Sequence, residues 1–258
     1  MPNWVVNNIN FIGEKEDIAK VIERITTIGL EEELDLTRED YDSAIVESID
    51  FNKIIPMPSS LNLECGSMTD RAIITYLTKK GTISPEEFNK KALEKFDKMF
   101  FFGTIESKYK SMVDNGTDLT DNETYILGEK YVNNFLKYGS TTWYDWACAH
   151  WGTKWNACDS FIDKDNDTIT FETAWSCPAP ILKELALICK MYNVAFQGEY
   201  CDENYYGDNK GSFFAKNGEI DFGFPTTPEE ELAIIEKTWG ELDGEFLEEF
   251  LEYKKNNW

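Results

Sequence analysis

The chain has few of the residues on which most metal sites and nucleophilic enzymes depend. Its 258 residues include one histidine, His150, and six cysteines that stand singly, without a CxxC pair. A zinc site usually needs clustered cysteine and histidine ligands. The phosphate loop GxxxxGK[ST], the dinucleotide fingerprint GxGxxG and the esterase motif GxSxG are missing as well. We therefore predict no metal, no cofactor and no recognisable set of catalytic residues.

Long apolar runs are also missing, which argues against a membrane span of about 20 residues. The first residues, MPNWVVNNINF, lack the basic and apolar segments of an export signal. The single cysteines fit reduced core residues of a cytosolic protein. We expect the chain to work in the cytosol of its host cell.

Positive charge is scarce. Lys and Arg number 25 against 48 Asp and Glu, which gives a net charge of −23 and a pI near 4.4. A nucleic-acid-binding protein needs the opposite sign, because neutralising phosphates supplies much of its affinity. The simplest interpretation is an acidic, well-solvated surface. A sharper one is a basic partner, such as a protein that normally grips nucleic acid.

The order of the expected elements predicts an α+β fold. Residues 4–12 alternate as a strand, and residues 14–28 follow as an amphipathic helix that ends at Gly29. A second strand–helix–strand series occupies 168–175, a helix from Pro178 or Pro180, and 194–201. Asn217-Gly218 then turns a hairpin. These features indicate a ferredoxin-like antiparallel sheet with its helices on one face.

The remaining segments suggest additions to that sheet. We predict a ferredoxin-like domain from residues 1–68 plus 139–225, a helical insertion at 69–138, and an acidic C-terminal helix at 226–258. In the insertion, helices are expected at 70–80, after Ser84 and after Thr120, and its lysine-rich run from 79 to 110 has eight lysines against five acids. Residues 31–50, with nine acids against one arginine, suggest a solvated loop or ribbon, and residues 51–61 a short strand.

The stretch WYDWACAHWGTKWNACD at 143–159 concentrates four tryptophans, two cysteines and the single histidine of the chain. Large aromatic residues favour cores, so the favoured interpretation is that this stretch packs in the core and joins a helix end to the sheet. The alternative is a ligand pocket formed by His150, Trp151, Lys154 and Trp155 together with acids from 199–208. Lys154 could stack on a ring or hold a ligand carboxylate or phosphate, but pairing with Asp145 or Asp159 is the favoured interpretation. Cys148 would share one face with His150 if the segment were a strand, which is weak evidence for a catalytic pair.

Two acidic motifs have structural and functional interpretations. DKDNDT at 163–168 resembles half of a calcium loop, but lacks its glycine and its last glutamate, so a hairpin turn explains it better. EYCDENYYGD at 199–208 combines carboxylates with tyrosines. Such sets occur in sugar-cleaving sites, but an acidic recognition surface is the favoured interpretation.

Several motifs resemble the YubB/Api92-like family of phage and plasmid proteins. They are MPNW at 1–4, the N-x-x-x-x-G run that reaches Gly13, IIPMP at 54–58, WYDW at 143–146, WGTKWNA at 151–157 and TAWSCPAP at 173–180. The resemblance covers about residues 1–60 and 140–215. It implies a ferredoxin-like domain and a mobile-element origin, but no established catalytic residues. The cysteine spacing fits no iron–sulfur cluster.

We therefore expect a non-enzymatic mobile-element protein that inhibits a host nucleic-acid-handling or defence protein by mimicking DNA through its acidic surface. The residues expected to bind that partner are Glu31, Glu32, Glu33, Glu229, Glu230, Glu231, Glu241, Asp243, Glu245, Glu248, Glu249 and Glu252. The alternative is a small-molecule-binding protein or enzyme with a pocket beside WGTKW. Direct binding of nucleic acid to a sheet face is a third hypothesis, disfavoured by the charge.

Overall fold

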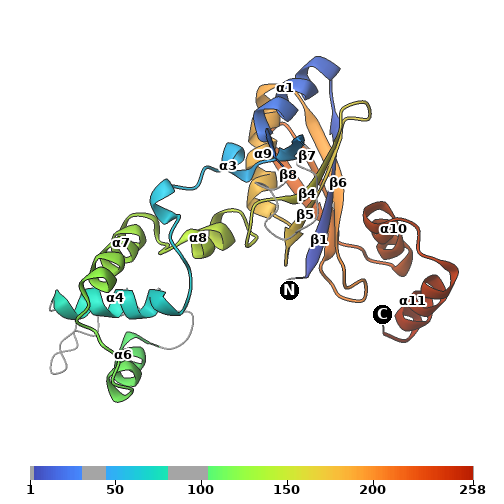
Figure 1. Cartoon of the computed structure of the whole chain (residues 1–258). Coiled ribbons are helices and arrows are strands. Elements are labelled where there is room, and N and C mark those ends of the chain that lie inside the picture. Colours follow the sequence, from blue (N-terminus) through green and yellow to red (C-terminus); the bar gives the residue numbers. More distant parts are fainter. Residues whose placement is uncertain (1–2, 31–44, 81–103, 258) are drawn as a thin grey trace. The chain divides into compact units, whose positions relative to one another are not determined.

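The computed structural model describes residues 3–30, 45–80 and 104–257. The chain divides into two compact units. Met1–Pro56 with Cys148–Trp258 form one, called the sheet unit here, and Met57–Ala147 form the other, called the helical unit. The acids at 31–33, residues 81–103 of the lysine-rich run and the start of the helix expected after Ser84 lie outside the described residues. Figure 1 shows the elements of both units.

The sheet unit is built on a six-stranded antiparallel sheet in the order β4-β5-β1-β6-β7-β8. Its strands are β1 (Trp4–Ile12), β4 (Cys158–Asp163), β5 (Thr168–Ala174), β6 (Ala195–Asp202), β7 (Lys210–Lys216) and β8 (Glu219–Gly223). The helix α1 (Lys15–Ile25) follows β1, and the helix α9 (Ala179–Met191) connects β5 to β6. The chain order β1-α1-β4-β5-α9-β6 with β1 between β5 and β6 is that of a ferredoxin-like fold, so the predicted fold class is confirmed.

Alternating side chains fix the two faces of the central strand. Val5, Ile9 and Phe11 are buried on the face that α1 and α9 cover in Figure 1. Ile18, Val21, Ile22 and Ile25 of α1 and the apolar positions of α9 complete this core. The predicted turns are also present: Asn217 and Gly218 have φ angles of 57° and 86°, as a two-residue hairpin between β7 and β8 requires.

Two local predictions are wrong. The first helix ends at Ile25, and residues Thr26–Leu30 form β2, which pairs with β3 (Ile45–Ile49). Ile28 is therefore 70% exposed instead of buried on a helix. Residues 51–61 do not form a strand: Asp50 caps the helix α3 (Phe51–Ile54), and the 3-10 helix η1 (Ser59–Leu61) follows.

The helical unit has a core of its own. Its longer helices are α4 (Ser67–Lys79), α6 (Ile105–Asp114) and α7 (Asn122–Tyr138). Ile73, Leu77, Tyr131 and Val132 are among the buried residues that hold α4 and α7 together. The expected helices at 70–80 and after Thr120 are thus present, although the N-cap of α7 is Asp121, whose carboxylate accepts a hydrogen bond from the Thr124 amide at 2.7 Å.

The C-terminal segment forms two helices in place of the single one predicted. Thr227 caps α10 (Pro228–Trp239) as the motif TPEE indicated, Gly240 ends it with a φ of 91°, and α11 (Gly244–Asn257) follows. α10 packs against β6, β1 and β7 on the face of the sheet opposite α1 and α9. Within the described ranges, no helix is both long and apolar enough to span a membrane.

Candidate functional site

The tryptophan-rich segment divides into a helix and a turn. Residues Trp143–His150 form α8, so the strand on which Cys148 and His150 would share a face is not formed. Residues two apart on a helix point in different directions. The Cys–His hypothesis therefore loses the geometry on which it was based.

Trp151 belongs to the core. Its side chain is buried, its Nε1 donates a hydrogen bond to the Ile55 carbonyl at 2.9 Å, and its ring meets the Phe51 ring edge-on at 5.8 Å. Thr153 and Ser176 anchor the following turn by donating to the carbonyls of Ala174 and Gly152. At this position the packing interpretation of the motif holds.

Lys154 stacks on aromatic rings. Its ammonium lies 4.0 Å from the centre of the Trp155 ring and 5.3 Å from that of Trp175, and Trp155 in turn contacts Trp4 at 6.0 Å. It makes no ion pair with any described acid, so the favoured pairing with an acid is wrong and the ring-stacking alternative is the one observed. Trp175 was not singled out from the sequence. It is 42% exposed and has a φ of 74°, which is strained for a bulky residue.

The carboxylates of the 199–208 motif do not converge. Asp202 is buried and accepts hydrogen bonds from the Asn204 amide and the Asn209 side chain, while Glu199 pairs with Lys237. Tyr205 and Tyr206 pack against α10 and α11. DKDNDT forms the expected β4–β5 turn, in which Asp163 accepts from the amides of residues 165 and 166. Among the described residues, no group of three His, Cys, Asp or Glu side chains could hold a metal ion.

The predicted partner-binding acids on α10, on α11 and in the connection between them are mostly at the surface. The exposed ones are Glu229, Glu230, Glu241, Asp243, Glu245, Glu248, Glu249 and Glu252. Some also stabilise helix starts: Glu230 accepts from the amide and hydroxyl of Thr226, and these hydrogen bonds hold the pKa of its carboxyl below the ordinary value. We call this set of eight exposed carboxylates the acidic surface.

Glu231 differs from its neighbours because it is only 3% exposed. It lies between two buried lysines: Lys210 of β7 is 3.2 Å from its Oε1 and Lys254 of α11 is 2.7 Å from its Oε2. Lys210 also donates to the Tyr205 carbonyl at 2.8 Å. This buried Lys–Glu–Lys triad ties the sheet to both C-terminal helices. A sequence signal existed, since Glu231 precedes the buried Ile234 and Ile235 at helical spacing.

An apolar cluster completes the attachment. Ile234 and Ile235 of α10 and Phe250 of α11 pack against Cys201 of β6. Trp239 donates its Nε1 hydrogen to the Cys201 carbonyl at 3.1 Å. Burial of this kind stabilises the two helices on the sheet and so fixes the backbone that carries the acidic surface.

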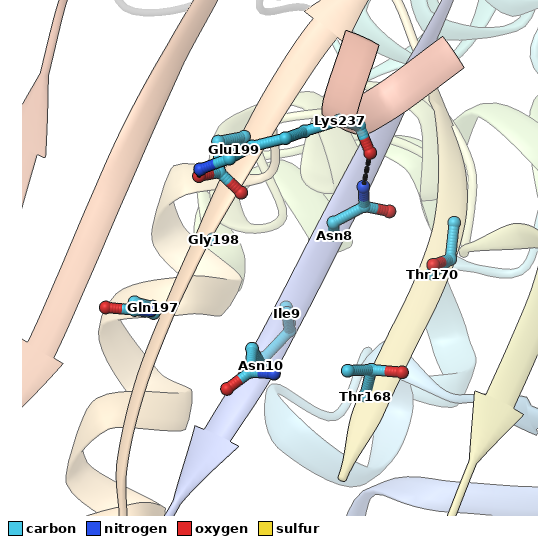
Figure 2. A pocket seen from close by; sticks show the side chains of 9 residues that line it. All are labelled: Asn8, Ile9, Asn10, Thr168, Thr170, Gln197, Gly198, Glu199 and Lys237. Carbon is cyan, nitrogen blue, oxygen red and sulfur yellow. Dashed lines mark hydrogen bonds and ion pairs between the residues drawn. The ribbon is translucent and has the colours of Figure 1, made fainter. Parts of the chain in front are cut away.

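α10 covers only part of this face of the sheet. Beyond its C-terminal end lies a hollow of about 380 Å³ whose floor is formed by β5, β1 and β6 (Figure 2). Asn8 donates a hydrogen bond from its side chain to the Lys237 carbonyl, and Glu199 pairs with the Lys237 ammonium. Asn10, Thr168, Thr170 and Gln197 line the rest.

A family model of a ferredoxin-like domain matches part of the chain, in agreement with the topology of the sheet unit. Residues 150–240 match the family model described as the ferredoxin-like domain in Api92-like protein. This region is similar to the Api92-like proteins. The match spans β4 to α10 and so includes the buried Glu231 and the Lys237 beside the hollow.

The other comparisons add little. No curated protein matches the chain. The crystal structure of a protein api92 from Yersinia pseudotuberculosis is 12% identical, with 88% of this chain and 99% of that chain covered and a TM-score of 0.36.

Proposed function

We propose that this chain is a non-enzymatic binding protein that inhibits a host nucleic-acid-handling or defence protein by covering its basic surface. The supporting observation is the acidic surface, whose exposed carboxylates stand on two helices anchored by the buried triad and on the connection between them. Anchored charges lose little freedom on binding, and a partner that binds DNA phosphates would meet a similar array of negative groups.

The charge balance of the two helices favours this role. From Glu229 to Trp258 there are ten acids and three lysines. Lys254 is buried against Glu231, and Lys237 pairs with Glu199. Little positive charge therefore remains near the acidic surface to offset its field, which can steer a basic partner from a distance.

The proposed origin is a phage or plasmid, with the protein acting in the host cytosol. The motifs that resemble YubB/Api92-like proteins support this origin. The proposed absence of catalysis rests on the motifs missing from the sequence. The alternative pocket beside WGTKW has less support, because Trp151 is a core residue and Lys154 is already stacked on two rings.

Affinity capture tests the proposal. The tagged chain is incubated with host lysate at low salt, the retained proteins are eluted with a salt gradient, and the eluates are identified by mass spectrometry. We expect a DNA- or RNA-binding protein that elutes as salt shortens the range of electrostatic attraction. Its nucleic-acid binding should decrease when the purified chain is added. Retention of proteins that bind no nucleic acid, or no effect on that activity, would contradict the proposal.

A further inference from the structure

The uncovered part of the sheet carries a grid of polar side chains. The strand register places Thr170, Asn8, Glu199 and Ser212 in one row across β5, β1, β6 and β7. A second row consists of Thr168, Asn10, Gln197 and Phe214. Side chains directly opposite on paired strands share a face, with strands about 4.8 Å apart. The two rows therefore present amides and hydroxyls at regular spacing.

The grid forms the floor of a continuous hollow. The cavity of about 380 Å³ over β5, β1 and β6 adjoins a second of about 420 Å³ over β6, β7 and β8. Gln197, Gly198, Glu199 and Lys237 line both. Each cavity is within the usual size of small-molecule sites.

The hollow is polar, and its charged lining residues are Glu199, Lys237 and, in the second cavity, Asp221. Lys237 is the only cation among its lining residues, and its ammonium pairs with Glu199. The net charge of −23 also repels phosphate. A ligand that suits this hollow should be neutral and should both donate and accept hydrogen bonds.

Asn8 offers a free acceptor at the centre of the grid. Its Nδ2 donates to the Lys237 carbonyl, whereas its Oδ1 is buried and has no hydrogen-bond partner among the described residues. In Figure 2 this oxygen points away from Lys237 towards β5. A buried acceptor without a partner costs free energy. The oxygen is enclosed in this structure, so a ligand hydroxyl would reach it only after the Asn8 side chain rotates.

Phe214 supplies an apolar surface at the edge of the second row. Its ring is 43% exposed and lines the second cavity. Exposed rings next to amides and hydroxyls suit a molecule with one apolar face and a rim of hydroxyl groups. Nucleotides have the hydroxyls but also carry phosphate, and an extended peptide would need a free strand edge instead of a sheet face.

We propose that this hollow is a binding site for a neutral carbohydrate of one or two sugar units. Asn10, Gln197 and the threonine hydroxyls would bind its hydroxyl groups, and Phe214 would stack on the apolar face of a ring. The site is separate from the acidic surface and does not depend on the proposed inhibitory role.

Saturation-transfer NMR tests the site with a panel of neutral sugars: glucose, galactose, mannose, N-acetylglucosamine, maltose and cellobiose. At about 10 mM, a complex with a Kd near 1 mM is readily detected. We expect at least one sugar to bind. Asn10→Ala and Gln197→Ala, which replace exposed side chains, and Phe214→Ala should each weaken that binding at least tenfold. Asn133→Ala, an exposed amide on α7, is the matched control and should leave the affinity unchanged.

Three results would overturn the proposal. The first is that no sugar gives a signal. The second is that Asn10→Ala, Gln197→Ala and Phe214→Ala leave the sugar affinity unchanged. The third is that a twelve-residue oligothymidine binds in the same hollow in preference to the sugars. The oligothymidine is tested in the same assay. If it binds and these variants weaken its binding, the site would be reassigned to nucleic acid.

Discussion

The ammonium of Lys254 lies 2.7 Å from Oε2 of Glu231, and both side chains are more than nine-tenths buried. Lys210 contacts the other carboxylate oxygen at 3.2 Å. One carboxylate therefore compensates two buried ammonium groups from different elements. The arrangement makes Glu231 the member of the triad whose loss should cost most.

Glu231→Gln should reduce the free energy of unfolding by about 3–5 kcal/mol, because it leaves two buried lysines without a counter-charge. Lys254→Met should cost less, since Glu231 keeps Lys210 as its partner. Urea unfolding followed by circular dichroism measures both. The exposed Lys255→Met is the control and should stay within about 0.5 kcal/mol of the parent. Equal losses for the Glu231 and Lys254 variants would show that the carboxylate is not the centre of the triad.

Gly128→Ala should disrupt the helical unit. A Cβ at this position would lie 1.9 Å from the Ala72 carbonyl oxygen, where α7 packs on α4. Moving either helix backbone aside would disturb the packing of α4 on α7, so we expect the free energy of unfolding to fall by about 3 kcal/mol or more. Gly244→Ala is the matched change, because nothing lies within 4 Å of its added Cβ. It should be neutral or stabilising by up to about 0.5 kcal/mol in thermal unfolding. Similar losses for both variants would contradict the close packing of α4 on α7.

The cysteines should differ widely in their reactivity. Cys65 is exposed, whereas burial raises the pKa of Cys189 to about 12 and that of Cys201 to about 11. The thiolate is the reactive form, so iodoacetamide at about pH 8 should label Cys65 first. Peptide mapping should find Cys189 and Cys201 labelled only after denaturant is added. Early labelling of Cys201 in the native protein would mean that α10 does not stay on the sheet.

Asp163 should make stability depend on acid pH. Hydrogen bonds from the Asn166 side chain and backbone hold its pKa below the ordinary value of 3.8. The folded state thus favours the ionised carboxylate, and its contribution is present above pH 3.8 and lost as the pH falls through the folded pKa. The difference in Tm between the parent and Asp163→Ala should therefore be larger at about pH 6 than at about pH 3. A gap that does not change with pH would contradict this origin.

The elements that the sequence predicted correctly depend on local signals. β1 alternates, α9 has a helical apolar stripe, and Asn217-Gly218 can adopt the positive φ angles of a tight turn. The end of α1 was missed because Ile28 extends the helical spacing. The run of β-branched residues from Ile25 to Ile28 also suits a strand, and pairing with β3 decides in its favour.

Long-range contacts explain what the sequence left open. Nothing local separates the buried Glu231 from the exposed Glu229 and Glu230, since its lysine partners come from β7 and α11. The polar grid was missed for a similar reason. Asn8, Thr170 and Gln197 are distant in sequence, and only the strand register places them on one face.

The most direct test of the acidic surface compares two variants that each lose four negative charges. One carries Glu229→Gln, Glu241→Gln, Glu245→Gln and Glu248→Gln on α10, α11 and their connection. The other carries Glu64→Gln, Glu106→Gln, Asp114→Asn and Glu123→Gln, all exposed in the helical unit. Both variants should fold, so a difference between them reports the position of the charges and not their number.

The measurement is capture of the nucleic-acid-binding partner from host lysate at about 50 mM and about 500 mM salt, where the range of electrostatic attraction differs about threefold. We predict that the parent and the helical-unit variant retain the partner at low salt and release it at high salt, while the α10–α11 variant does not retain it at either. Equal retention by all three proteins, or retention that salt does not affect, would contradict the proposed function.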